Sequence, residues 1–114
     1  MTTIAQHLDA AAENIRQANH ASREPVTRPD AYAVVGSLAE LVHRLSQLLD
    51  YLARGLGCAD PADHYDDRGH DPIGALLAAQ DDLRAADAAA RTLAGHLDHA
   101  HNHLGHLGRR ITED

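Results

Sequence analysis

An apolar pattern with a period of seven residues runs through the C-terminal third of the chain. One set of apolar side chains recurs every seven positions and a second set follows it by three, as in the a and d positions of a helical seam. Asp71 and Pro72 mark its start, because the carboxylate can accept from free amides and proline needs no N–H at the first helical position. The pattern predicts a long helix over residues 72–108. The a positions are Leu76, Leu83, Ala90, Leu97, Leu104 and Ile111, and the d positions are Ala79, Ala86, Leu93, Ala100 and Leu107.

Two earlier segments also have helical periodicity. Residues 3–22 carry one narrow apolar stripe, whereas residues 30–56 carry two adjacent stripes and are expected to have neighbours on two sides. Pro25 and Pro29 predict a turn or short link between these segments. The central segment is therefore expected to be the middle helix of the fold.

Local residues predict where these two helices begin and end. Thr2 or Thr3 can cap the first helix, and Asp30 can cap the second. Gly55 or Gly57 can supply a left-handed stop after the second. Residues 57–71 then form an acidic loop without periodicity, and residues 112–114 are expected to be a disordered tail.

These elements predict an all-α single domain, residues 1–114, built as a three-helix up-down antiparallel bundle with a long C-terminal helix. At 1.5 Å per residue the helices are about 30, 40 and 55 Å long, so the last turns of the third extend beyond the second. This excess motivates dimerisation into a larger bundle, with the chain as a homo-oligomer or a partner of another helical protein. The expected interface residues are Leu93, Leu97, Leu104, Leu107 and Ile111.

Composition excludes several classes of partner. The formal net charge is −7, and the arginines are scattered apart from Arg109 and Arg110, so binding to nucleic acid is not expected. No stretch approaches the roughly 20 apolar residues that span a bilayer. Cys58 is the only cysteine, so no intrachain disulfide is expected, and residues 1–8 lack the features of a secretory signal. A cytoplasmic location is the expectation.

Histidine is the most conspicuous chemical feature, with ten in the chain and five between His96 and His106. Spacings of three and four place His96, His99, His103 and His106 in one stripe, whereas His101 lies on the other flank. Imidazoles one turn apart suit Zn, Ni or Cu, so a metal site is the alternative interpretation of the stripe. The favoured interpretation is that the stripe borders the apolar seam, where the rings cover neighbouring side chains and keep their nitrogens in water.

Other chemistry has little support in the sequence. The loop holds potential ligands, but their spacing matches no EF-hand, which favours a solvated acidic turn over a Mg or Ca site. Cys58 follows a glycine that is expected to end the helix, and nothing nearby activates it as a nucleophile. No cofactor and no catalytic residue are expected. The loop candidates are Cys58, His64, Asp66, Asp67, His70 and Asp71.

The stretches Asp30-Ala-Tyr-Ala-Val-Val-Gly-Ser-Leu-Ala-Glu-Leu and Leu45-Ser-Gln-Leu-Leu-Asp-Tyr-Leu resemble uncharacterised small Ala-rich helical proteins of actinobacteria. The resemblance implies a helical fold and transfers no functional residue. The sequence therefore predicts a non-enzymatic helical protein–protein interaction or self-assembly module. The alternative is a metal-binding or metal-sensing bundle that uses His96 to His106.

Overall fold

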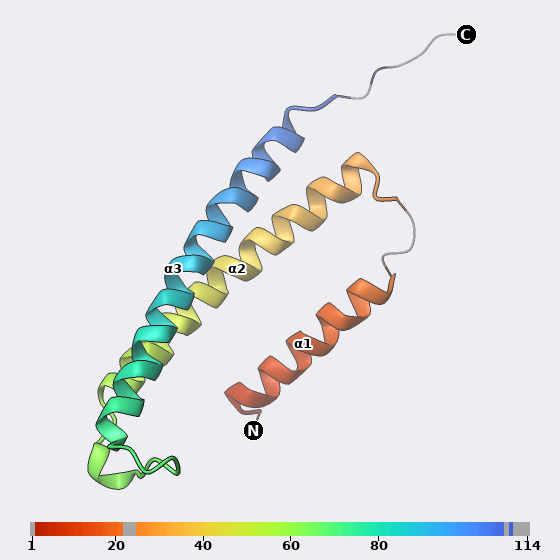
Figure 1. The fold of residues 1–114 in the computed structure, drawn as a ribbon. Coiled ribbons are helices and arrows are strands. Elements are labelled where there is room, and N and C mark those ends of the chain that lie inside the picture. The colour runs from red at the N-terminus through yellow and green to blue at the C-terminus, as the bar shows by residue number, and fades with distance from the viewer. Residues whose placement is uncertain (1, 22–24, 109, 111–114) are drawn as a thin grey trace. The chain divides into compact units, whose positions relative to one another are not determined.

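The computed structural model describes residues 2–21, 25–108 and 110. Its elements are the helices α1 (Ile4–Ala21), α2 (Arg28–Gly57) and α3 (Pro72–Gly105), with a short 3₁₀ helix η1 (Pro61–Asp63) between the last two (Figure 1). The described residues include no strand, so the expected all-α class with three long helices is confirmed. The chain divides into two compact units, Met1–Ala31 and Tyr32–Asp114.

The first unit contains α1, and its start is fixed by a capping box. The Gln6 amide donates to Thr3 Oγ1 at 3.2 Å, and the Thr3 amide donates to Gln6 Oε1 at 2.8 Å. On the polar side, Arg16 and Gln17 both donate to the Glu13 carboxylate. Of the two threonines expected to cap this helix, Thr3 is the one that does so.

The apolar stripe of α1 has no partner within its own unit. Ile4, Leu8 and Ile15 are between 40% and 49% exposed, and the helix has no buried residue. The helix is therefore amphipathic, with the Glu13–Arg16 pair on one side and its apolar groups exposed on the other.

The start of α2 differs from the sequence prediction, whereas its end at Gly57 lies within one residue of the expected Leu56. The helix begins at Arg28, where the Ala31 amide donates to the Thr27 carbonyl at 2.7 Å, so Asp30 lies in the first turn and is not the cap. Pro29 permits this early start because its missing N–H falls among the free amides of the first turn.

The expected left-handed stop at Gly55 or Gly57 is also wrong. Among the described residues only Gly69, in the loop, has positive φ, at 82°. The Cys58 and Ala59 amides instead donate to the carbonyls of Gly55 and Leu56, each at 3.2 Å. These short-range bonds satisfy the last carbonyls and remove the need for a left-handed residue.

The start of α3 matches its signal in the sequence. Asp71 Oδ1 accepts from the Ile73 amide at 3.0 Å, with Pro72 at the first helical position. The helix continues through Gly95 and ends at Gly105. Ile111 and residues 112–114 lie outside the described residues, so the predictions about them stay predictions.

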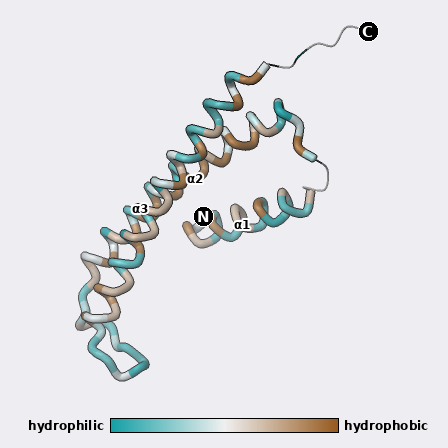
Figure 2. The backbone as a smooth tube through the Cα atoms, turned by 45° about the horizontal axis from the view of Figure 1, so that its top comes forward, coloured by the Kyte–Doolittle hydropathy of each residue, from teal (hydrophilic) through white to brown (hydrophobic). Residues whose placement is uncertain are grey.

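In the second unit, α2 and α3 lie side by side and antiparallel (Figures 1 and 2). Tyr32, early in α2, contacts His101, late in α3. The carbonyl of Ala53, late in α2, accepts from Gln80 Nε2, early in α3, at 3.0 Å. We call this pair, from Tyr32 to Gly105, the hairpin.

The core of the hairpin is made of small residues. Ala53 is 0% exposed and Ala94 is 1% exposed, and Val42 and Ala90 are buried. Leu49 and Leu97 pack against Val42, Ala90 and Ala94 as half-buried neighbours. Alanine at the contact lets two helices approach toward the short end of the usual range, about 8 Å between axes.

The buried rows of α3 are a and e, rather than the a and d rows expected from the sequence. Ala90, Ala94 and Leu97 face α2, whereas Leu93, at a d position, is 49% exposed. The e row includes Gln80, Asp87, Ala94 and His101. It faces inward because its polar members contact α2, as when Gln80 donates to the Ala53 carbonyl. The d row is therefore directed away from the centre of the hairpin.

Candidate interaction surface

One long edge of the hairpin seam is polar and ties the two helices together. His43 Nε2 lies 2.9 Å from Asp98 Oδ2, and the Ser46 hydroxyl donates to Asp87. With the Gln80 bond to the Ala53 carbonyl, these contacts are distributed along most of the seam. They bond specific pairs of residues and so help to fix the register of α3 on α2.

On this edge, hydrogen bonds from two side chains stabilise the charged form of Asp87. It accepts from the Ser46 hydroxyl and from Arg91 Nε, the latter at 3.2 Å. The Ser46 bond, followed by the Arg91 bond, lowers the pKa of the Asp87 carboxyl below its usual value. The carboxylate is therefore held in its charged form.

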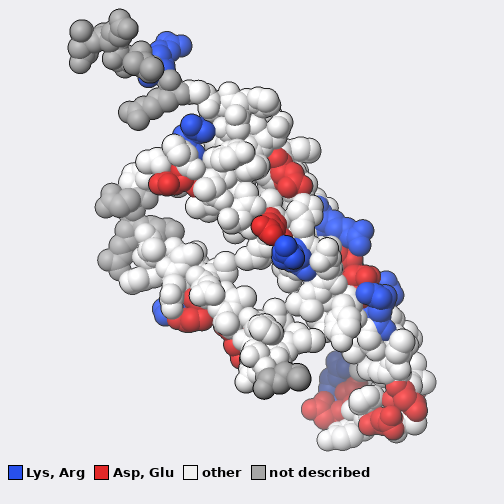
Figure 3. All heavy atoms as spheres, turned by 180° about the vertical axis from the view of Figure 1, so that it is seen from behind, with Lys and Arg blue, Asp and Glu red and all other residues white. Residues whose placement is uncertain are grey.

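A shallow hollow of about 470 Å³ lies along the polar edge. Its charged groups already have partners: Arg44 bonds Glu40 at 2.8 Å, and His43 bonds Asp98. Acidic and basic side chains are also interspersed along the hairpin, with acidic groups gathered at the loop end (Figure 3). The hollow offers no uncompensated charge that points to a ligand.

The opposite edge of the seam is apolar. Leu45 follows Val42 by three residues and precedes Leu49 by four, so it borders the core on the side away from His43. Leu93 stands in the same relation to Ala90 and Leu97 on α3. Leu45 is 38% exposed and Leu93 is 49% exposed, so a substantial part of each side chain remains exposed beside the hairpin core.

Leu45 and Leu93 belong to continuous apolar rows, which together we call the apolar face. On α2 the row follows spacings of three and four and includes several exposed large side chains. Near the loop, Leu52 and Leu83 line one hollow of about 540 Å³. The apolar face consists of Val34, Leu38, Leu41, Leu45, Leu48 and Leu52 on α2, of Ala79, Ala86, Leu93 and Ala100 on α3, and of Leu107 just beyond the end of α3.

The structure separates the interface residues expected from the sequence. Leu93 and Leu107 are exposed, whereas Leu97 packs against the hairpin core and Leu104 is half-buried. Ile111 lies outside the described residues. The α2 half of the apolar face was missed, although the second stripe in residues 30–56 was its signal.

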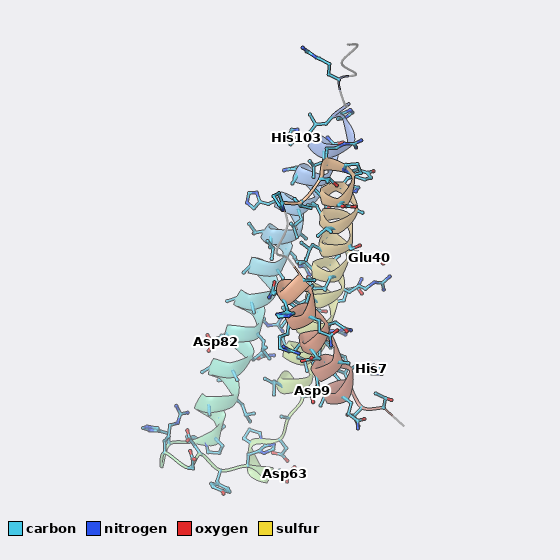
Figure 4. The ribbon with its side chains drawn as sticks, turned by 90° about the vertical axis from the view of Figure 1, so that its right-hand side faces the viewer. His7, Asp9, Glu40, Asp63, Asp82 and His103 are labelled. Carbon is cyan, nitrogen blue, oxygen red and sulfur yellow. The ribbon has the colours of Figure 1, made fainter. Side chains whose placement is uncertain are left out.

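The histidine stripe lies on the outside of α3. His96, His99, His103 and His106 are all exposed. Within residues 2–21, 25–108 and 110, no three His, Cys, Asp or Glu side chains lie together in a group that could hold a metal ion. His101 faces the other way, and its ring stacks on Tyr32. The end of α3 that carries His103 is opposite the loop that carries Asp63 (Figure 4).

The loop is organised by its own carboxylates. Asp66 accepts from the Arg68 backbone amide and from the Arg68 guanidinium, and its side chain is 4% exposed. The Arg68 bonds lower the pKa of the Asp66 carboxyl. Asp60 Oδ1 accepts from the Ala62 amide at the start of η1. These bonds give Asp60 and Asp66 local structural roles, and Cys58 is exposed beside the loop.

Comparison of the chain with protein-family models, with curated proteins and with solved structures finds no match. Across the part of the chain that the structure describes, no helix combines the length and the apolar character needed to cross a bilayer.

Proposed function

We propose that this protein is a non-enzymatic helical interaction module that assembles through the apolar face of its hairpin. The observation that carries the proposal is the row of exposed leucines on α2, continued by Leu93 on α3 and by Leu107 just beyond its end. Extended exposed apolar surface on a folded chain is typical of protein–protein contact.

The contrast between the two edges of the seam supports this proposal. Polar groups on one edge are paired within the hairpin, for example His43 with Asp98, and need no other molecule. Leucines on the other edge remain in water, and covering them contributes roughly 25 cal/mol for each Å² of apolar surface removed. The free energy available for association is therefore concentrated on the apolar face.

Closure of a three-helix bundle by the chain itself and assembly with a second chain are two ways to cover the apolar face. The sequence motivates the second, because the long third helix has an excess of apolar positions. We therefore propose a dimer, with Leu93 and Leu107 in its interface together with the leucines of α2.

The solution molar mass of the untagged full chain tests this function. Light scattering over a range of concentrations is expected to give twice the chain mass of 12.3 kDa at the upper end. Leu45→Glu is expected to shift the protein toward monomer, because it buries a charge in the interface. Gln47→Glu is the matched control, since Gln47 is exposed in α2 on the polar edge and lines the polar hollow. A wild-type monomer at every concentration, or equal dissociation in both variants, would contradict the proposal.

A further inference from the structure

The two halves of the apolar face differ in side-chain size. The α2 half is formed by leucines and one valine, whereas most of the α3 half is alanine, with Leu93 near its middle. The α2 half therefore carries larger side chains than the α3 half, and a surface of this kind packs best against one with the opposite arrangement.

Contacts across the hairpin show which residues of the two halves lie at the same level. Gly36 lies against His101 near one end, and Ala53 bonds Gln80 near the other. Because the helices are antiparallel, each step forward on α2 matches a step back on α3. Leu38, Leu45 and Leu52 are therefore level, within about one turn, with Ala100, Leu93 and Ala86 respectively.

We propose that the occupant of the apolar face is a second copy of this chain, related by a two-fold axis parallel to the helices. This inference rests on the proposed function and specifies its geometry. Rotation about this axis keeps each level and exchanges the halves, so Leu38 of one copy lies over Ala100 of the other, and Leu52 lies over Ala86. Leu45 of each copy then meets Leu93 of the other.

The alternative two-fold axis, perpendicular to the helices and parallel to the face, fits poorly. It places leucine rows on leucine rows and alanine rows on alanine rows, which crowds one side of the interface and leaves voids on the other. Both axes give a four-helix bundle in which every helix is antiparallel to its two neighbours, so the sizes of the facing side chains distinguish them.

Complementary charges at Leu45 and Leu93 test this geometry. Leu45→Glu and Leu93→Arg are each expected to weaken self-association by about tenfold or more, since each homodimer places two charges against leucine. Mixing the two variants is expected to restore a dimer, because one contact becomes Glu–Arg and the other stays Leu–Leu. Light scattering and sedimentation of the separate and mixed full-length chains measure both effects.

Gln47→Glu mixed with Leu93→Arg is the control, and it is expected to give no restored heterodimer. Failure of Leu45→Glu and Leu93→Arg to rescue each other, while the wild type is dimeric, would overturn the two-fold arrangement and leave the proposed function standing. A wild-type chain that is monomeric throughout would remove both.

Cysteine pairing keeps the test usable if either charged variant fails to fold. In a Cys58→Ser background, Leu45→Cys mixed with Leu93→Cys is expected to form a disulfide-linked heterodimer under mild oxidation. Neither variant alone is expected to cross-link, because the two copies of each position lie on opposite sides of the axis. Cross-linking of Leu45→Cys with itself would overturn the proposal, as it requires leucine rows to face each other.

Discussion

The rings of Tyr32 and His101 stack across the hairpin with 4.1 Å between their centroids and 18° between their planes. Two glycines make room for this pair. A Cβ on Gly36 would lie 2.9 Å from His101 Nε2, and a Cβ on Gly105 would lie 3.2 Å from Tyr32 Cε2. The stacked rings thus close the end of the hairpin opposite the loop, where the backbone of each helix admits the ring from the other.

We expect Gly36→Ala to leave the free energy of unfolding almost unchanged. Alanine gains about 1 kcal/mol in helix propensity over glycine, but the new methyl group displaces His101 from Tyr32. In a His101→Ala background the same change should stabilise the protein by about 1 kcal/mol. Urea denaturation measures both values.

Gly95→Ala is the control for that comparison, because nothing lies within 4 Å of a Cβ built at Gly95. It should stabilise the protein by about 1 kcal/mol in either background. Equal stabilisation by Gly36→Ala and Gly95→Ala in the wild-type chain would show that the stacked His101 ring does not need a glycine at position 36.

The alanine core gives a second prediction. Ala94→Leu should destabilise the protein by about 1–3 kcal/mol, because Ala94 is 1% exposed and belongs to the hairpin core with Val42 and Ala90. Ala85→Leu, at an exposed position of α3, should change stability by less than about 0.5 kcal/mol. Thermal and urea unfolding of the two variants decide the matter, and a tolerated Ala94→Leu would mean that the helices are not closely packed.

Local signals in the sequence were sufficient to predict the helices. Asp71 and Pro72 start α3 as expected, and Thr3 caps α1, because caps depend on the few residues beside them. Two local signals failed, the Asp30 cap and the glycine stop of α2. At the start of α2 the helix begins earlier, in a first turn that contains proline, and at its end short-range hydrogen bonds satisfy the last carbonyls instead of a left-handed glycine.

The choice of buried face on α3 could not be predicted in the same way. Rows a and d are both apolar in sequence, so periodicity alone favours them as the seam. In the structure Asp87, from the e row, faces the Ser46 hydroxyl, which turns row e inward and row d outward. Which row is buried thus depends on side chains of another helix, some 40 positions away, and no pattern within α3 reports it.

The Ser46–Asp87 bond predicts a loss of stability in acid. The pKa of Asp87 is lower in the folded chain than in an unfolded one, so the folded state binds fewer protons and stability increases with pH in this range. The contribution is complete above the unfolded pKa of about 3.9 and is lost as pH falls through the lowered folded pKa. We expect Ser46→Ala to raise the pKa of Asp87 and to reduce its share of this acid-dependent loss.

Carbon-detected NMR titration of the Asp87 carboxyl measures that shift directly, and urea unfolding between pH 2 and pH 7, run about one unit apart, measures its effect on stability. Glu40→Gln is the control for removing an exposed surface carboxylate, since Glu40 pairs with Arg44 one turn away on the same helix. An unchanged titration of Asp87 in Ser46→Ala would show that the hydroxyl does not support its charge.

Metal binding through the histidine stripe makes a separate prediction. His99 and His103 lie one turn apart on the exposed side of α3, and no third donor completes a site among the described residues. Two imidazoles supply half of the ligands of a tetrahedral site, so we expect only weak binding of Zn, Ni or Cu to the untagged chain. Calorimetric titration with each metal salt, repeated on the His99→Ala, His103→Ala double variant, measures it. A stoichiometric, tightly held ion that the double variant loses would instead support the metal-binding function, with the missing ligands supplied by a second copy.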